Sequence, residues 1–541
     1  MMNKNELTLR PYYWRATNLF PEKELVSRMH DEIFYYTYGE FGERVAKLAN
    51  ALSNIGIGIG SRVGTIGWNH HHHFEAYYAV PLIGAQLHTI NPVLPDEKIE
   101  YIINDARDDI LFVDPNGPTE VLDRIWENLN SDPKVVVMGK TSSNPESDSV
   151  AIDYESFINN VEPIEEWPEL TEDLPAGMCY TSGTTGMPKG VEYTQKMIYT
   201  HAMMTMTPSA LNISERDVVM PVVPMFHVNS WEFPYAVTMA GAKQVYPGPS
   251  PSSADLAHLI EQEGVTLTAG VPTVWINLLE YLEEHDRDIS TLERIIVGGS
   301  ATPKSVIQHY NDKYNVAIEH AWGMTETMSI GSVSRVKSNL LNISMDEELN
   351  LLTKQGLLSP GLEMRVVQDS KEVPWDGKTS GELWVRGPTV VNSYYNCSDE
   401  SKDNFEDGWL KTGDIVVIDT NGYIEVVDRK KDVIKSGGEW ISSIELENEL
   451  MSHNAVAEAA VISVPHERWQ ERPFACVVLR QGFEIDANKL HNEIRDKFER
   501  WQLPDNIVFL DEIPKTATGK FDKKTLRSQF KNPELRWTPG E

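Results

Sequence analysis

Over the first 330 residues, the apolar positions follow two periods, one typical of helices and one typical of short buried strands. Residues 37–55 carry apolar side chains at helical spacing, and a Gly-rich turn then leads into the short apolar run at 63–68. Because strands that alternate with helices form βαβ units, this pattern predicts a mostly parallel sheet. The alternation continues with helical spacing at 74–83 and 97–105 and with apolar runs at 84–89, 110–114, 135–139, 265–270, 295–297 and 316–320.

The pattern changes after residue 380. Residues 381–427 contain short apolar strands joined by turn residues, which predicts a β-rich subdomain. After a polar segment, the pattern of a small α/β unit follows. Its predicted elements are a helix at 443–451, strands at 457–464 and 474–479, and a helix at 486–501. We therefore predict an α/β fold with a large N-terminal domain over 1–428, made of α/β subdomains and the β-rich subdomain, and a small C-terminal α/β domain over 429–541.

Charge and cysteine usage narrow the classes of function. The chain has 541 residues and a formal net charge of −33, which disfavours nucleic acid and anionic membranes as partners. Any anion site must therefore be locally basic or built from backbone N–H groups. Cys179, Cys397 and Cys476 are far apart and form no CxxC pair, which favours free thiols in a reducing compartment. No apolar stretch is long enough for a membrane span, and the N-terminus lacks a signal-peptide pattern, so we expect a cytoplasmic enzyme.

Four consecutive histidines, His70–His73, raise the question of a metal site. No Cys, Asp or Glu accompanies them at a spacing typical of metal ligands. A role at a helix start, on the surface or in packing, is therefore favoured over metal binding.

The densest cluster of small polar residues is Tyr180–Gly190, YTSGTTGMPKG, directly after the strand-like run AGMCY. Glycine lets backbone N–H groups surround a phosphate, Ser and Thr add donors, and Lys189 adds a positive charge. The P-loop spacing GxxxxGK[ST] fails, because Pro188 stands where its second glycine would follow Gly183. The alternatives are therefore a nucleotide site of another type and a flexible polar turn.

YTSGTTGMPKG resembles the phosphate loop of the adenylate-forming superfamily, which contains acyl-CoA synthetases, adenylation domains of peptide synthetases and luciferases. The resemblance covers nearly the whole chain, because later motifs of that family follow in order. These are HAWGMTET (320–327), GELWVRG (381–387), WLKTGDI (409–415), DRKKDVIKSGGEWIS (428–442) and PKTATGK (514–520). Within the family, MFHVNSW (225–231) and GGSATP (298–303) are similar to the medium- and long-chain fatty acyl-CoA synthetase branch.

The resemblance implies a nucleotide site, and each of its residue types has a physical reason. An indole offers a flat surface to adenine, a hydroxyl can donate to the α-phosphate, and a carboxylate can accept both ribose hydroxyls. Without the resemblance, Asp414 reads as a turn residue and Arg429 as a solvated charge. The implied nucleotide residues are Thr181, Ser182, Gly183, Thr184, Thr185, Gly186, Gly299, Ser300, Ala301, Trp322, Gly323, Met324, Thr325, Asp414, Arg429 and Lys520.

The implied catalytic residues are Lys520, Thr325, Glu326 and Lys189. An ammonium at Lys520 can neutralise the α-phosphoryl oxygens as pyrophosphate leaves, although composition alone would make it a surface lysine in a Lys-rich tail. Glu326 supplies a hard oxygen for Mg²⁺, and the resemblance assigns Thr184 to the same ion.

The acyl-binding and CoA-binding residues are predicted from the resemblance alone. His227 and Trp231 are similar to the aromatic wall and the gate of the acyl tunnel, and Tyr235 is assigned to the same pocket. Glu232 departs from the family, in which small residues are usual at this position. It could block a long acyl tail, pair with a polar substrate or point outside. The CoA channel is implied at Gly437, Gly438 and Trp440, and Lys431 matches the hinge, near 428–433, about which the small C-terminal domain swings.

The activity implied is that of an AMP-forming acid–thiol ligase. A fatty or related carboxylic acid and Mg-ATP would form an acyl-adenylate, which CoA would then convert to acyl-CoA. A homodimer is implied by some relatives only. Three alternatives remain open: transfer to a carrier protein, a non-catalytic binding protein and a simple ATPase. The chain ends soon after PKTATGK, both Lys520 and Glu326 are present, and the P-loop spacing fails, so each alternative is disfavoured.

Overall fold

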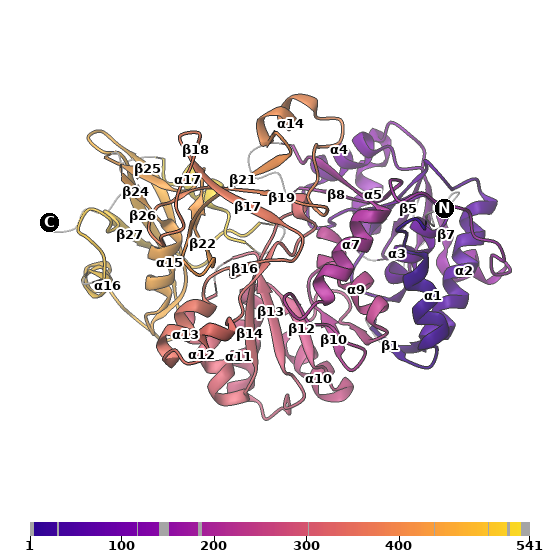
Figure 1. The fold of residues 1–541 in the computed structure, drawn as a ribbon, viewed down its shortest axis with the longest axis horizontal. Helices are drawn as coiled ribbons and strands as arrows, with labels where there is room; N and C mark the ends of the chain where they lie inside the picture. Colours follow the sequence, from indigo (N-terminus) through magenta and orange to yellow (C-terminus); the bar gives the residue numbers. More distant parts are fainter. Residues whose placement is uncertain are drawn as a thin grey trace.

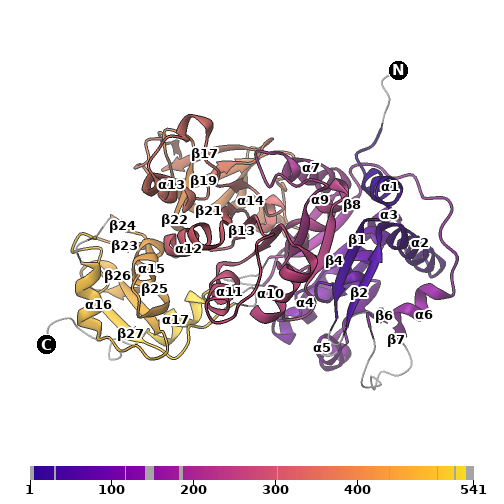
Figure 2. The same cartoon turned by 90° about the horizontal axis from the view of Figure 1, so that it is seen from below.

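The computed structural model describes residues 5–29, 32–115, 117–139, 151–181, 187–300, 302–437, 439–495, 497–516 and 520–531. These residues form four β-sheets. Figures 1 and 2 show the N-terminal residues, in indigo, at one end of an elongated molecule and the C-terminal sheet, in yellow, at the other end. The predicted α/β fold class is confirmed, with α/β and β-rich parts in the predicted order.

The first α/β layer is a seven-stranded sheet in the order β7-β6-β5-β3-β4-β8-β9, parallel except for the β8–β9 pair. The helix predicted at 37–55 is confirmed: Thr37 and Glu40 form a capping box at its start. The strands are β3 (Arg62–Ile66), β4 (Gln86–Thr89), β5 (Ile110–Val113), β6 (Lys134–Val137), β7 (Ala151–Asp153), β8 (Pro175–Tyr180) and β9 (Gly190–Thr194). The helices of this region are α1 (Arg10–Leu19), α2 (Tyr38–Asn54), α3 (His71–Leu82), α4 (Asp96–Ala106), α5 (Pro118–Ile125), η1 (Trp126–Asn128), α6 (Tyr154–Asn159) and α7 (Gln195–Met206).

The second α/β layer is a nine-stranded sheet in the order β16-β15-β14-β13-β12-β10-β11-β1-β2, with a parallel centre. One core contains buried residues of both layers, including Val63 of β3 and Ile296 of β13, so the layers pack against each other. The strands are β1 (Glu24–Arg28), β2 (Ile33–Thr37), β10 (Val218–Pro221), β11 (Lys243–Tyr246), β12 (Leu267–Gly270), β13 (Arg294–Gly298), β14 (Ala317–Trp322), β15 (Ser332–Val333) and β16 (Leu357–Leu358). The helices are α8 (Val228–Trp231), α9 (Phe233–Ala240), α10 (Ser253–Glu263), α11 (Pro272–Glu284), α12 (Lys304–Tyr314), η2 (Thr325–Thr327), η3 (Ser338–Leu340) and α13 (Met345–Leu352).

The β-rich part predicted over 381–427 is confirmed as a six-stranded antiparallel sheet. It begins earlier in the chain than predicted, because residues 363–372 supply two of its strands. Its elements are β17 (Glu363–Gln368), β18 (Lys371–Glu372), β19 (Gly381–Arg386), α14 (Ser398–Asn404), β20 (Phe405–Glu406), β21 (Trp409–Ile418) and β22 (Ile424–Arg429).

The C-terminal part is a five-stranded sheet with its own helices and its own apolar cores, drawn only from residues 434–526. The helix predicted at 486–501 is shorter, because the chain turns after residue 494 and brings Leu503 and Ile507 into the core. The sheet begins five residues after β22 ends. Its elements are β23 (Ile434–Ser436), β24 (Glu439–Ile441), α15 (Ser443–Met451), β25 (Val456–His466), β26 (Gln470–Leu479), α16 (Ala487–Ile494), β27 (Asn506–Phe509) and α17 (Lys523–Gln529).

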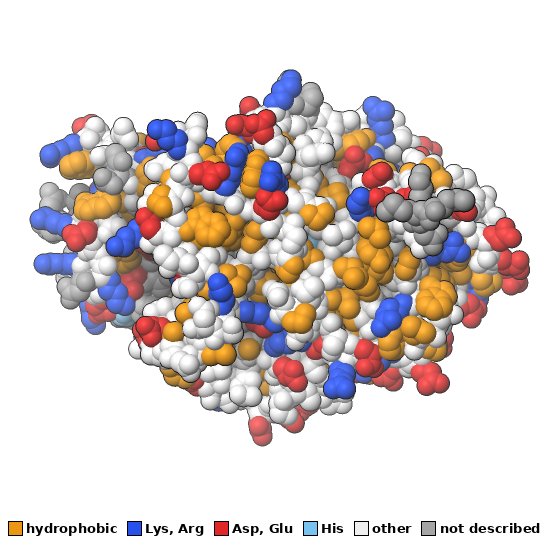
Figure 3. All heavy atoms as spheres, in the orientation of Figure 1, with side chains coloured by type: hydrophobic (Ala, Val, Ile, Leu, Met, Phe, Trp, Pro, Cys, Tyr) orange, Lys and Arg blue, Asp and Glu red, His pale blue; other side chains and the backbone are white. Residues whose placement is uncertain are grey.

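The surface carries charges of both signs. Figure 3 shows acidic and basic side chains scattered over this face without a broad basic field. None of the helices in the described part of the chain is both long and apolar enough to cross a lipid bilayer.

Candidate active site

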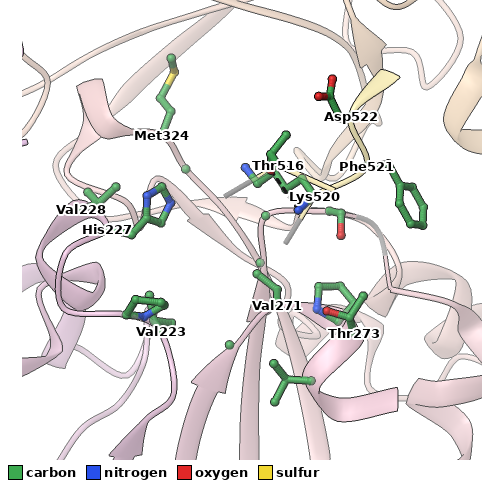
Figure 4. Close-up of a pocket in the computed structure, with 18 of the residues that line it drawn as sticks. Val223, His227, Val228, Val271, Thr273, Met324, Thr516, Lys520, Phe521 and Asp522 are labelled. Atoms are coloured by element: carbon green, nitrogen blue, oxygen red, sulfur yellow. Dashed lines mark hydrogen bonds between the residues drawn. The ribbon is translucent and has the colours of Figure 1, made fainter. Parts of the chain in front are cut away.

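A cavity of about 1720 Å³ is bordered by both α/β layers, the β-rich sheet and the C-terminal part. Figure 4 shows Lys520 on one side of it and His227 with Val228 on the other. The cavity brings together predicted site residues that are far apart in the sequence. Those that line it are Thr181, Lys189, His227, Trp231, Gly299, Ser300, Trp322, Gly323, Met324, Thr325, Glu326, Asp414, Arg429, Lys431 and Lys520.

Two hydrogen bonds to Thr516 hold the backbone of Lys520. The N–H of Thr516 donates to the Lys520 carbonyl at 2.7 Å, and the N–H of Lys520 donates to Thr516 Oγ1 at 3.2 Å. Its Cε lies 3.2 Å from the position that a Cβ on Gly299 would occupy, so the glycine leaves room for this side chain. Burial and the nearby Arg429 lower the pKa of Lys520 to about 8, although Asp414 acts in the opposite direction.

Asp414 is held from two sides. Trp322 Nε1–H donates to its Oδ2 at 2.8 Å, and Arg429 Nε lies 2.7 Å from its Oδ1, because β21 and β22 pair these two residues directly. Each carboxylate oxygen has a further lone pair, so Asp414 can still accept hydrogen bonds from a ligand. The bond also fixes the Trp322 indole, which packs so closely on Gly331 that a Cβ there would lie 2.6 Å from the ring.

Glu326 is buried at the cavity wall, beside a residue that sequence analysis missed. The hydroxyl of Tyr394 donates to Glu326 Oε1 at 2.6 Å, and Lys189 Nζ lies 4.7 Å from the centre of the Tyr394 ring. Burial raises the pKa of Glu326, while Arg429 and Lys189 act in the opposite direction. Tyr394 lies in the run NSYYN, which matches no chemical motif, so only the fold reveals its contact.

Thr181 and Lys189 are hydrogen-bonded to each other at the two ends of the predicted phosphate loop. The N–H of Thr181 donates to the Lys189 carbonyl at 2.9 Å, and the N–H of Lys189 donates to Thr181 Oγ1 at 3.1 Å. This ladder continues the β8–β9 hairpin to the mouth of the loop. The remaining predicted loop residues, together with two others, lie outside the described residues: Ser182, Gly183, Thr184, Thr185, Gly186, Ala301 and Gly438.

The predicted adenine-side segments sit at the carboxyl ends of β13 and β14, where ligands commonly bind in parallel sheets. Ser300 is positioned by His320, whose Nε2 lies 3.2 Å from the Ser300 carbonyl. At Gly323 a Cβ would lie 1.0 Å from the carbonyl oxygen of Ser329, so only glycine fits there. The N–H of Met324 donates to Thr327 Oγ1 at 3.0 Å, which starts the short helix η2 that carries Thr325 and Glu326.

The predicted acyl residues divide into two groups. His227 and Trp231 line the cavity, and burial together with Lys520 lowers the pKa of His227 to about 3, so its ring is neutral. Glu232 and Tyr235 are buried but do not line it. The Tyr235 hydroxyl donates to the backbone carbonyl of Tyr77 at 3.2 Å. The Glu232 side chain is 1% exposed and does not line the cavity, so the alternative that it points outside the acyl tunnel stays a prediction.

The segment that joins these two groups has an unusual backbone. The five residues Val228–Glu232 all have positive φ, between 45° and 63°. Left-handed backbone costs about 1 kcal/mol or more per non-glycine residue. A buried left-handed turn of this length is therefore strained, and such strain gathers at functional sites.

The predicted CoA residues lie away from the cavity. Gly437, with φ 63°, turns the β23–β24 hairpin, and its N–H donates to the Trp469 carbonyl at 2.9 Å. The side chain of Trp440 on the same hairpin is exposed. Neither residue lines the cavity, whereas the predicted hinge residue Lys431 does.

The four histidines open helix α3, and all four are buried, so the helix-start and packing roles are confirmed and the surface role is wrong. His70 is the N-cap residue: its ring accepts from the N–H of His73 at 3.3 Å. The ring's other nitrogen lies 2.6 Å from Asp114 Oδ1.

One ligand atom each of His71, His72 and Glu155 lie within 4.8 Å of one another. Arg44, however, donates to both carboxylate oxygens of Glu155, at 2.6 and 3.0 Å, and also binds the buried Glu75. A guanidinium at this position opposes a second cation and satisfies the carboxylates. We interpret the cluster as a structural network that holds α3 to α2 and α6.

Comparison with known proteins gives concordant results. The model of the AMP-binding enzyme family matches residues 13–395, and that of the AMP-binding enzyme C-terminal domain matches residues 445–520. The chain is 44% identical to a long-chain-fatty-acid–CoA ligase of Thermus thermophilus, covering 98% of this chain and 97% of that protein. It is 40% identical to a medium-chain-fatty-acid–CoA ligase of Ectopseudomonas oleovorans, covering 99% and 98%. The crystal structure of an anthranilate CoA ligase with anthranoyl-AMP has the same fold, with a TM-score of 0.87 at 24% identity and coverage of 97% of both chains.

Proposed function

The chain belongs to the AMP-binding enzyme family, and on this premise we propose that it is an ATP-dependent carboxylate–CoA ligase acting through an acyl-adenylate. One observation carries the proposal. Lys520 enters from the C-terminal part into the cavity, which Asp414 and Glu326 line from the N-terminal part and Arg429 lines from the end of β22. The cations of Lys520 and Arg429 and the carboxylates of Asp414 and Glu326 therefore surround a space open to a nucleotide and an acid. Each carboxylate is hydrogen-bonded to other protein groups.

In the first step, a carboxylate oxygen of the acid attacks the α-phosphorus of ATP, and the bond to pyrophosphate breaks. Carboxylates are ionised at pH 7, so no general base is required. Lys520 and Arg429 neutralise the charge on the reacting phosphoryl oxygens, and Asp414 accepts the ribose hydroxyls. The neutral ring of His227 would lie beside the attacking acid without adding a further positive charge to those of Lys520 and Arg429.

Mg²⁺ fits the phosphate side of the cavity. Glu326 offers a buried carboxylate, and hard oxygen atoms are the ligands that Mg²⁺ prefers. Glu326 would hold the ion, with Thr184 as the second residue assigned to it. The ion would supply charge neutralisation for the departing pyrophosphate, while Tyr394 keeps the Glu326 carboxylate in place.

In the second step, the thiolate of CoA attacks the acyl carbon of the adenylate, and AMP leaves. We propose that the C-terminal domain, residues 429–541, first rotates about Lys431. The rotation would remove Lys520 and bring Gly437, Gly438 and Trp440 to the cavity. Two features support this proposal: the C-terminal part has its own apolar cores, and the β23–β24 hairpin lies outside the cavity while Lys520 lies inside it.

We propose a fatty or related carboxylic acid as the substrate. The cavity wall around His227 is apolar, with contributions from Val223, Phe226, Val228 and Val271. Such a lining suits an acyl chain, because burying its methylene groups contributes about 0.8 kcal/mol each. The relatives named for long- and medium-chain acids support the same substrate class.

The test is pyrophosphate release by purified protein with Mg-ATP across short, medium and long carboxylic acids, with and without CoA. Release that depends on the acid, followed by thioester formation only when CoA is present, supports the function. We also propose a cytoplasmic location, which the buried Cys179 and Cys476 support because neither forms a disulfide. The homodimer stays a prediction, to be checked by light scattering.

A further inference from the structure

Behind Trp231, hydrogen-bonding groups without partners gather in the interior. Both carboxyl oxygens of Glu232 and the amide nitrogen of Asn229 are buried and have no hydrogen-bond partner among the described residues. A buried polar group without a partner costs about 1–3 kcal/mol. Three such atoms on one left-handed turn therefore need an explanation.

The neighbours of Glu232 could have paired with it but do not. Burial raises the pKa of Glu232 well above its ordinary value, and Asn229 lies close enough to act in the opposite direction. Five buried hydroxyl and thiol groups lie near enough for the charge of Glu232 to affect their own pKa values, yet each donates elsewhere. Tyr77 donates to Met225, Tyr78 to Pro234, Tyr193 to Thr325, Tyr235 to Tyr77 and Cys179 to Asn229 Oδ1.

Glu232 is also close to the cavity. Trp231, the residue before it, lines the cavity, and its ring lies 2.9 Å from the position of a Cβ on Gly298. Both residues belong to the strained turn 228–232, so a change of that backbone would move the Trp231 ring and expose Glu232 together. An acyl chain that passes Trp231 would therefore meet the unpaired groups.

We propose that Glu232 and Asn229 form a specificity site for a hydroxyl group on the acyl chain, so that the protein prefers hydroxy-substituted acids. This inference rests on the proposed function, because an acyl chain reaches Glu232 only when its carboxylate lies near Lys520. A hydroxyl group has one donor and two acceptor sites. It can donate to a Glu232 oxygen and accept from the Asn229 amide, which matches the unpaired set.

Charge and hydrogen bonding favour a hydroxyl group at this site over an ammonium group, a second carboxylate or an unsubstituted chain. Burial raises the pKa of Glu232 well above its ordinary value and so favours the neutral carboxyl, which would not attract an ammonium group. A second carboxylate would be buried without a cation, at high cost. An unsubstituted methylene chain would leave all three polar atoms unpaired. Sites built to bind a substrate hydroxyl discriminate strongly against the analogue that lacks it.

The experiment compares kcat/KM for pyrophosphate release between unsubstituted acids and acids of equal length with the hydroxyl at successive carbons. We expect the wild type to prefer one hydroxyl position by on the order of tenfold or more. Glu232→Gly should lower this preference by at least that factor. It should also raise kcat/KM for longer unsubstituted acids. Glu232→Gln should retain part of the preference, because an amide still donates and accepts. Glu263→Gln, a largely buried glutamate on α10 away from the cavity, is the matched control and should leave the ratio unchanged.

Two results would overturn the inference alone. The first is normal pyrophosphate release with no preference for any hydroxyl position. The second is an equal rise of kcat/KM for both kinds of acid in Glu232→Gly, which would show that Glu232 only blocks the acyl chain sterically. Failure of the proposed function looks different, because then no acid of either kind releases pyrophosphate, and both proposals fall. Thermal unfolding of each variant shows whether it is folded. If Glu232→Gly does not fold, an unchanged ratio in Glu232→Gln at every hydroxyl position overturns the inference.

Discussion

The two ends of the cavity differ in whether their buried polar groups are hydrogen-bonded. At the nucleotide end, Asp414 is bonded to Trp322 and Arg429, and Glu326 is bonded to Tyr394. At the acyl end, Glu232 and the amide nitrogen of Asn229 have no partner among the described residues, and the backbone is strained. The first end therefore has its carboxylates already held by protein groups, whereas the second has polar groups without described partners.

This difference follows from what each end has to recognise. Every reaction of this type uses the same nucleotide, so its site gains from groups that are already held in place. The acid is the variable partner, and unpaired groups or strain at that end can be relieved by the correct substrate. Under the proposed function, preorganised groups would set the rate at the nucleotide end, and substrate specificity would be set at the acyl end.

The largest effect should come from Lys520→Ala. It removes the cation from the phosphoryl group, and we expect adenylate formation to fall by on the order of 10²–10³-fold. Transfer to CoA from supplied acyl-adenylate should be largely spared, because Lys520 is proposed to leave the site for that step. Separate assays of the two half-reactions measure this. Equal loss of both would contradict the domain rotation.

The pH dependence gives the next effect. The pKa of Lys520 is lowered to about 8, and the protonated form is the active one, so charge is present below this pH and lost above it. In the free enzyme, kcat/KM for adenylate formation should fall towards tenfold per pH unit above about pH 8. Lys520→Arg stays protonated to much higher pH. Its profile should therefore be flat through this range, and the same fall in that variant would assign the pKa to another group.

A smaller change is expected for Tyr394→Phe. It removes one hydrogen bond to the Glu326 carboxylate, and bonds to charged groups contribute about 1.5–3 kcal/mol. The Mg²⁺ concentration for half-maximal rate should rise about tenfold, while the chain-length profile stays the same. Tyr395→Phe, at the neighbouring tyrosine, is the control. A rise in both variants would point to a general loss of structure in this segment.

The smallest effect concerns stability at the acyl end. Glu232→Gly removes a buried unpaired carboxyl group and places glycine at φ 63°, where it has no steric cost. The thermal midpoint should therefore rise by a few degrees, in contrast to most changes of buried residues. Differential scanning fluorimetry measures it. A lower midpoint would mean that Glu232 has a stabilising partner.

Local patterns predicted most elements of the fold. The capping box at Thr37 and the helical spacing behind it specify α2, and the short apolar runs became parallel strands. The helix predicted at 486–501 was too long, because burial of Leu503 and Ile507 in the C-terminal core outweighs local helical spacing. Strands β17 and β18 were missed, since their exposed and half-buried positions give a weak alternation.

The site was predictable where residues carry motifs and not where contacts are long-range. Lys520 and Asp414 were found through motifs, but the bond between Asp414 and Trp322 joins residues 92 positions apart. Tyr394 and Asn229 were missed, because their roles depend on which side chains the fold brings beside them. Glu232 stood out as a departure from the family, but only the structure shows that its side chain is buried.

The central claim is that one cavity joins an organic acid to the α-phosphorus of ATP, and AMP formation tests it most directly. Purified protein is incubated with Mg-ATP and a broad mixture of carboxylic acids, with CoA present or absent, and AMP and thioester are quantified by chromatography. The account predicts acid-dependent AMP, with thioester only when CoA is present. No AMP with any acid, whatever thiol is supplied, would contradict it.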